Sequence, residues 1–217
     1  MSGFGYGCAI TQPDGSLWMS PEFTPMSLID KGAIPAKVGG FLQTRIPVNK
    51  SCLFFFKAEK KAGIMFTYSE VNGYYAITIK ELSGSPGIIT GYAFADMILP
   101  HSGYGIAMYN EYGEMVYHGE MMLLGVDFVP VTSHEFTKDV GYPCAVMATF
   151  VGNAVNVIRE PTQYSPIGAG EILATTAVAY GNTVSTGRIK VGNYVGLGRT
   201  KKLIDHLPII NTTKYDR

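Results

Sequence analysis

Short apolar segments separated by Gly-bearing turns run through almost the whole chain of 217 residues. Gly and Pro are spread nearly evenly. The longest stretch free of both, 48–62, contains Leu53-Phe54-Phe55-Phe56, a composition that favours a strand. Many short strands with closely spaced turns are typical of all-β proteins. We therefore expect an all-β fold built from antiparallel sheets.

A hairpin pattern occurs twice. Gly5-Tyr6-Gly7 precedes an apolar stretch, a turn at Asp14-Gly15 and a second apolar stretch, and Gly103-Tyr104-Gly105 precedes the same order with its turn at Tyr112-Gly113. Cys144-Ala145-Val146-Met147 also falls where Cys52-Leu53-Phe54-Phe55 falls in the first copy. The repeat predicts an internal duplication, with two tandem immunoglobulin-like β-sandwich domains at residues 1–100 and 101–217.

The pattern also places individual elements. Expected strands are 7–11, 17–20, 41–46, 52–57, 64–68, 74–79 and 88–94 in the first unit, and 106–109, 115–118, 144–150, 154–159, 172–180, 183–191 and 194–197 in the second. Segment 21–40, with three prolines and three glycines, is expected to be mostly loop. One helical turn is expected within 199–207, and an extended tail at 208–213 that reaches a neighbouring subunit. The expected structural turn positions are Gly15, Gly73, Gly105 and Gly113.

Charge is scarce in this chain. Apolar residues make up 47% and charged residues 16%, below the roughly 25% usual in soluble chains. Interfaces are depleted in charge, so the composition favours an oligomer. The alternative is an ordinary β-protein whose exterior is rich in Ser, Thr, Gly and Tyr.

Net charge is zero, which argues against a nucleic-acid partner because duplex binding needs a basic surface. No apolar stretch approaches the roughly 20 residues of a membrane helix, and no signal peptide is visible, so we expect synthesis in a cytoplasm. The three cysteines, Cys8, Cys52 and Cys144, form no disulfide framework and lack metal-ligand spacing.

Residues suited to catalysis are scattered. The four histidines, His101, His118, His134 and His206, include no pair at metal-ligand spacing. Asp205-His206 lacks a nucleophile in a suitable context, and Glu111 with Glu114 reads better as two solvated residues around a hairpin turn than as a glycosidase pair. Phosphate-loop and dinucleotide motifs are absent. We expect no catalytic, cofactor-binding or metal-binding residues, no cofactor, and a protein that is not an enzyme.

The second hairpin carries a resemblance to a known class of proteins. Its segment Tyr104-Gly105-Ile106-Ala107-Met108-Tyr109-Asn110, followed by Tyr112-Gly113 and Val116-Tyr117, resembles the small β-modules of tailed-bacteriophage tail and tail-tip proteins. The first copy departs from that pattern at Thr11-Gln12-Pro13.

The resemblance implies a non-enzymatic structural or adaptor component of a phage tail, located in the virion. Its partners would be other tail proteins and copies of itself, in a multiple of three, with a host surface receptor as a further candidate. A receptor- or carbohydrate-binding module is the alternative, with its site in loops such as 21–40 and 160–170. A small hydrolase is a third class, which would need a compact cluster of titratable residues in a pocket.

Overall fold

The protein is all-β, as the sequence pattern predicts. The computed structural model describes residues 10–11, 17–20, 23–103, 105–159, 168–196 and 204–217. These residues form seventeen strands and one turn of 3-10 helix. The elements are β1 (Ile10–Thr11), β2 (Leu17–Met19), β3 (Ser27–Ile34), β4 (Phe41–Pro47), β5 (Cys52–Ala58), β6 (Gly63–Val71), β7 (Tyr74–Ser83), β8 (Ile89–Ala95), β9 (Ala107–Tyr109), β10 (Met115–His118), β11 (Asp127–Pro130), β12 (Thr137–Asp139), β13 (Cys144–Met147), β14 (Phe150–Arg159), β15 (Gly168–Tyr180), β16 (Thr183–Gly196), β17 (His206–Asn211) and η1 (Thr212–Lys214).

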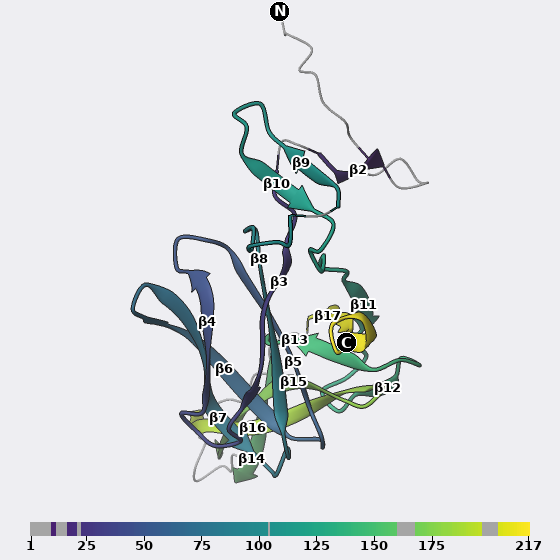
Figure 1. The fold of residues 1–217 in the computed structure, drawn as a ribbon. Helices are drawn as coiled ribbons and strands as arrows, with labels where there is room; N and C mark the ends of the chain where they lie inside the picture. Colours follow the sequence, from purple (N-terminus) through teal and green to yellow (C-terminus); the bar gives the residue numbers. More distant parts are fainter. Residues whose placement is uncertain (1–9, 12–16, 21–22, 104, 160–167, 197–203) are drawn as a thin grey trace, which may run out of the picture.

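Three larger sheets make up the body of the molecule, and all their paired strands are antiparallel (Figure 1). The largest sheet has the order β11-β17-β13-β5-β8-β3. A four-stranded sheet has the order β12-β16-β15-β14, and a three-stranded sheet has the order β4-β7-β6. Two further pairs, β1-β2 and β9-β10, are two-stranded hairpins.

The six-stranded sheet combines strands from both halves of the chain. Strands β3, β5 and β8 precede residue 100, whereas β11, β13 and β17 follow it. The two sets join where β13 pairs with β5, through Val146 opposite Phe56 and Met147 opposite Phe55. One core cluster also contains buried residues from both halves. Residues 1–100 and 101–217, the two expected units, thus both contribute strands to this sheet and side chains to this core.

Alternation along β5 explains why this sheet is apolar on both faces. Phe54 and Phe56 belong to the main core, which includes Ile77 of the three-stranded sheet and Val184 of the four-stranded sheet. Phe55 points to the opposite face and packs with Tyr215, which follows η1. Successive strand side chains point to opposite sides, so an unbroken run of three phenylalanines supplies both faces.

Two strands from different sheets cross at a pair of glycines. A Cβ atom on Gly187 of β16 would lie 2.7 Å from the Cα of Gly63 of β6. Any side chain there would force the backbones apart, so glycine is required for this close approach.

Two expectations about individual segments are wrong. Segment 21–40 contains the eight-residue strand β3, because its prolines at 25 and 35 flank the strand instead of interrupting it. Residues 199–203, in the range expected to hold a helical turn, lie outside the described residues; β17 begins at His206, and a turn of 3-10 helix follows it at Thr212–Lys214. The extended segment from Pro208 pairs with β11 and β13 of its own chain, so it is an interior strand and not an arm toward a neighbour.

Both expected hairpins are present as antiparallel strand pairs, each with a register shift. Gly73 lies in the turn Asn72-Gly73 between β6 and β7 with a φ of 83°, and Gly113 lies in the β9-β10 turn with a φ of 77°. Gly105, with a φ of 115°, precedes β9. Gly15, Cys8 and the two tyrosines of the Gly-Tyr-Gly triplets lie outside the described residues.

Candidate interaction site on the hairpin arm

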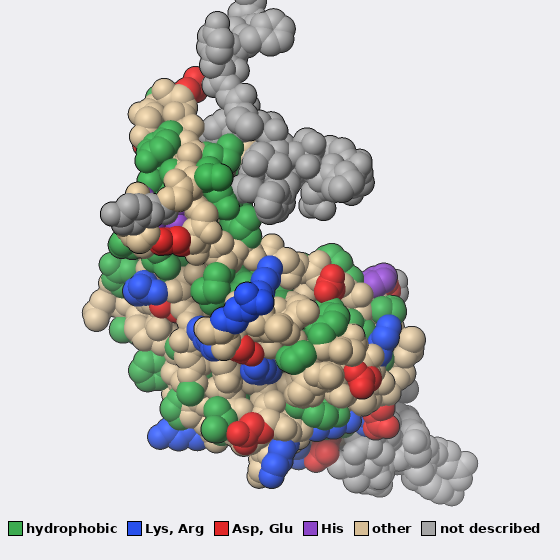
Figure 2. Space-filling view, turned by 45° about the vertical axis from the view of Figure 1, so that its right-hand side comes forward, with side chains coloured by type: hydrophobic (Ala, Val, Ile, Leu, Met, Phe, Trp, Pro, Cys, Tyr) green, Lys and Arg blue, Asp and Glu red, His purple; other side chains and the backbone are tan. Residues whose placement is uncertain are grey.

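The β9-β10 hairpin projects beyond the three larger sheets (Figure 1). We call residues 101–124 the hairpin arm. Hydrophobic side chains gather on it in Figure 2, together with acidic side chains. An isolated two-stranded hairpin is only marginally stable in water, so its turn and its root need other support.

Asn110 organises the turn at the tip. Its backbone N–H donates to the Glu114 carbonyl at 2.9 Å, and its carbonyl accepts from Gly113 at 3.0 Å. Its side-chain oxygen accepts from the backbone N–H groups of Tyr112 at 3.0 Å and Glu114 at 2.9 Å. Its amide nitrogen donates to the Glu114 carboxylate at 2.7 Å. Asparagine side chains form hydrogen bonds of this kind to nearby backbone groups in many turns. Here these bonds hold the loop in one conformation in the free protein.

Large apolar side chains are exposed at this turn and along the hairpin. Tyr112 is 79% exposed, Ile106 is 75% exposed and Tyr109 is 52% exposed. Tyrosine offers a large contact area with few rotatable bonds, and a pre-ordered turn lowers the entropy cost of binding. The tip therefore has the physical character of an anchor for another surface.

The root of the arm is tied to the body from two sides. On one side, Leu28 of β3 donates its N–H to the Met122 carbonyl at 2.9 Å, and Leu124 donates to the Met26 carbonyl at 2.9 Å. On the other side, the Leu123 carbonyl accepts from the Tyr215 hydroxyl and from Lys214 Nζ, each at 2.8 Å. These bonds make the residues around η1 a clasp for the arm.

A carboxylate beside the clasp is neutralised by two lysines. Asp216 Oδ1 accepts from Lys31 Nζ at 2.9 Å and from the Tyr92 hydroxyl at 2.7 Å, and Oδ2 accepts from Lys57 Nζ at 2.5 Å. Partial burial raises the pKa of the Asp216 carboxyl, but hydrogen bonds from the two ammonium groups and the phenol outweigh burial and hold the pKa well below its usual range. Burial and the bond to Asp216 raise the pKa of Tyr92. The cluster holds the last described residues on the sheet.

Two histidines meet at the root of the arm, although their spacing in the sequence gave no reason to pair them. The ring centroids of His101 and His118 lie 4.9 Å apart. His118 is 5% exposed, and neither ring nitrogen has a hydrogen-bond partner among the described residues. Nearby, the Glu120 carboxylate accepts from the hydroxyl and the backbone N–H of Ser102, which lowers the pKa of Glu120. Only the fold of the hairpin brings these groups together.

A second polar cluster, on β15 and β16, has a structural part. The Ser185 hydroxyl donates to the Phe136 carbonyl at 2.9 Å, and the Thr186 hydroxyl donates to the His134 carbonyl at 2.8 Å. Both hydroxyls are buried, and His134 Nδ1 contacts the buried Thr175 hydroxyl at 3.2 Å. These bonds join the segment before β12 to the sheet and leave the hydroxyls poorly placed to attack a substrate.

The remaining candidates from the sequence are dispersed. Glu111 is exposed beside the hairpin turn, and His206 is exposed at the start of β17. Burial raises the pKa of Cys52 to about 12 and that of Cys144 to about 11, so both thiols stay protonated at neutral pH. Within the described part of the chain, no three His, Cys, Asp or Glu side chains are grouped to hold a metal ion.

Comparisons with protein-family models, with curated proteins and with solved structures found no match to this chain. In the ranges that the structure describes, no helix has the length and apolar character needed to cross a membrane.

Proposed function

We propose that the chain is a non-enzymatic structural or adaptor component of a bacteriophage tail or tail tip. It would be made in the host cytoplasm, reside in the virion, and act through contacts with other tail proteins and with copies of itself. The observation that carries this proposal is the hairpin arm, where Tyr112 is exposed on a turn fixed by Asn110 and Ile106 is exposed at the base of the hairpin, before β9. Exposed aromatic side chains on a rigid element are the usual anchors of protein interfaces.

The assignment to a phage tail rests on the resemblance of this same hairpin to tail-protein modules. We include in the proposal that β1-β2 and β9-β10 derive from one duplicated motif, since both are antiparallel pairs with a register shift. Subunit numbers in multiples of three are part of the same proposal.

A receptor- or carbohydrate-binding module is the second candidate. The exposed rings of Tyr109 and Tyr112 favour it, because aromatic faces stack on sugars as well as on proteins. In that case the arm would bind glycans in the absence of any tail protein.

The decisive experiment locates the chain in purified phage particles. We expect mass spectrometry to recover it at a fixed ratio to other tail proteins after a high-salt wash, and antibody labelling in electron micrographs to mark the tail. Absence from the washed particles would contradict the proposal. Binding of the isolated protein to a glycan array, lost in Tyr112→Ser, would favour the second candidate.

A further inference from the structure

We propose that the hairpin arm of one copy docks into a recess on the body of a second copy, beside η1. The recess is the cavity lined by Gly125, Val126, Asp127, Asn211, Thr213, Lys214 and Arg217. The inference deepens the proposed function, because it names one subunit contact and its two surfaces.

Charge complementarity is the first argument. The arm contains three acidic residues, Glu111, Glu114 and Glu120, and no Lys or Arg. All 17 Lys and Arg residues lie in the rest of the chain, against 14 acidic residues. Two identical arms would repel each other, whereas the arm and the body carry opposite net charge. This pattern favours a contact between unlike surfaces of two copies.

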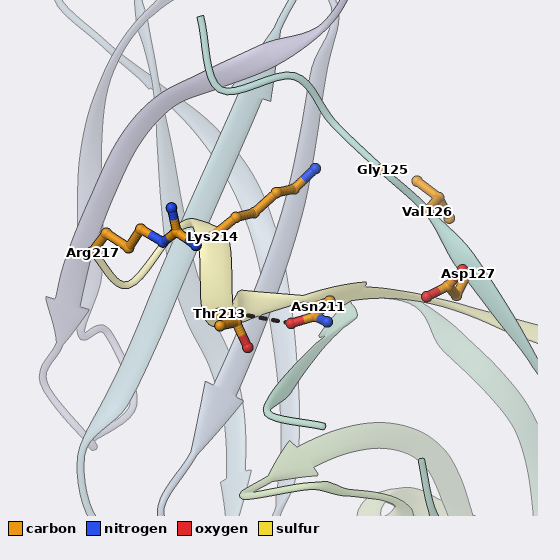
Figure 3. A pocket seen from close by; sticks show the side chains of 7 residues that line it. All are labelled: Gly125, Val126, Asp127, Asn211, Thr213, Lys214 and Arg217. Atoms are coloured by element: carbon orange, nitrogen blue, oxygen red, sulfur yellow. Dashed lines mark hydrogen bonds between the residues drawn. The ribbon is translucent and has the colours of Figure 1, made fainter. Parts of the chain in front are cut away.

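The shape and lining of the recess are the second argument. Its volume is about 420 Å³, within the range of about 300–1,000 Å³ in which proteins hold compact ligands, so one aromatic side chain fits. In Figure 3, Lys214 and Arg217 extend from one side of the recess, while Val126, which precedes β11, and Asp127, its first residue, lie on the other. The Asp127 carboxylate accepts from the Tyr142 hydroxyl at 2.5 Å. The recess thus places two exposed cations, Lys214 and Arg217, around the apolar side chain of Val126.

These surfaces suggest one arrangement. Tyr112 enters the recess, where the Lys214 and Arg217 cations can lie over its ring. Glu111, beside Tyr112 on the same turn, faces Arg217. In the free subunit Lys214 Nζ lies 4.7 Å from the centre of the Tyr215 ring and donates to the Leu123 carbonyl at 2.8 Å, so Tyr112 would add a second aromatic contact to this cation.

The contact is between copies and not within one. The hairpin lies beyond one end of the larger sheets, whereas the recess lies beside the C mark in Figure 1. The bonds of the Leu123 carbonyl to Tyr215 and Lys214 hold the root of the arm on its own body. Each copy would bind one neighbour through its arm and another through its recess. Such head-to-tail contacts add subunits until a ring closes or a filament forms.

Reciprocal charge reversal tests the contact by sedimentation velocity over a series of protein concentrations. We expect the wild type to associate, and Glu111→Lys or Arg217→Glu alone to weaken association at least about tenfold. The double variant, with the pair reversed, should recover most of the association. Glu70→Lys and Lys37→Glu make the same charge changes at exposed positions outside both surfaces and should associate like the wild type.

A second arm variant separates folding from docking. Tyr112→Ser should abolish association and leave the melting temperature unchanged, because the side chain is exposed. A monomeric wild type, unaffected association in the single variants, or failure of the double variant to recover would each overturn the inference. Recovery of the chain in phage particles would then still support the proposed function, so the two proposals fail separately.

Discussion

Lys57 Nζ lies 2.5 Å from Oδ2 of Asp216, which ties β5 in the middle of the six-stranded sheet to the residues after η1. The same carboxylate binds Lys31 and Tyr92, so one acidic side chain collects contacts from three strands of that sheet.

Asp216→Asn should lower the free energy of unfolding by about 2 kcal/mol at neutral pH, because charge-assisted hydrogen bonds to two lysines are lost. The pKa of Asp216 is lowered in the folded state, so its contribution is present above the unfolded value of about 4 and is lost as pH falls further. Urea unfolding at several pH values should therefore show the gap between wild type and variant closing below about pH 4. Glu70→Gln, at an exposed position, should show no such gap.

Tyr215→Phe should loosen the root of the hairpin arm. The hydroxyl donates to the Leu123 carbonyl at 2.8 Å and accepts from the Gly125 N–H at 3.1 Å, so its removal leaves two backbone groups without this partner. We expect a loss of about 1–2 kcal/mol and faster hydrogen exchange at the Gly125 amide. Tyr75→Phe removes a single bond to the Val48 carbonyl at 3.2 Å and should leave that amide unchanged. Equal exchange in both variants would argue against the clasp.

His118→Leu should stabilise the protein by about 1 kcal/mol. The imidazole is buried, and the described residues provide no partner for either nitrogen, so an apolar side chain avoids an uncompensated desolvation cost. Thr44→Val is the matched contrast, because its buried hydroxyl donates to the Tyr75 carbonyl at 2.7 Å, and it should destabilise. Destabilisation by His118→Leu would show that the ring has a partner after all.

Gly113→Val should destabilise the hairpin arm through its backbone alone. Gly113 has a φ of 77°, and a Cβ atom there would meet no other atom within 4 Å, so strain is the expected cost, about 1–2 kcal/mol. Melting curves and amide exchange in β9 and β10 measure it. Gly192→Ala serves as the control, because its φ is not positive and the nearest atom to a Cβ is 4.0 Å away. An unchanged melting temperature in both variants would contradict this account of the turn.

Sequence patterns predict the parts of the fold that are formed by residues close together in the chain. The strands around Asn72-Gly73 and the β9-β10 hairpin follow from local alternation and turn residues, and both are present. Such patterns do not predict which strands far apart in the sequence pair with each other. The similarity between 52–55 and 144–147 predicts equivalent strands but not their pairing, and β5 and β13 are neighbours in one sheet.

The candidate site was predicted in part. The hairpin itself was expected from its repeat, but its clasp depends on contacts between residues about 90 positions apart, such as Gly125 and Tyr215. The meeting of His101 with His118 likewise depends on the antiparallel return of the hairpin. The number of prolines and glycines in segment 21–40 predicts a loop. Their positions nevertheless allow β3, because Pro25 and Pro35 lie just outside the strand.

The position of β17 has a consequence for biosynthesis. This strand lies between β11 and β13, so until residues 206–211 have left the ribosome β11 has no partner in the largest sheet and β13 is paired on one edge only. Pairing between residues so distant in sequence is slow to form, and the waiting strand edges favour aggregation. A nascent chain stalled before residue 206 should therefore recruit holding chaperones, and release should come with synthesis of the last strand.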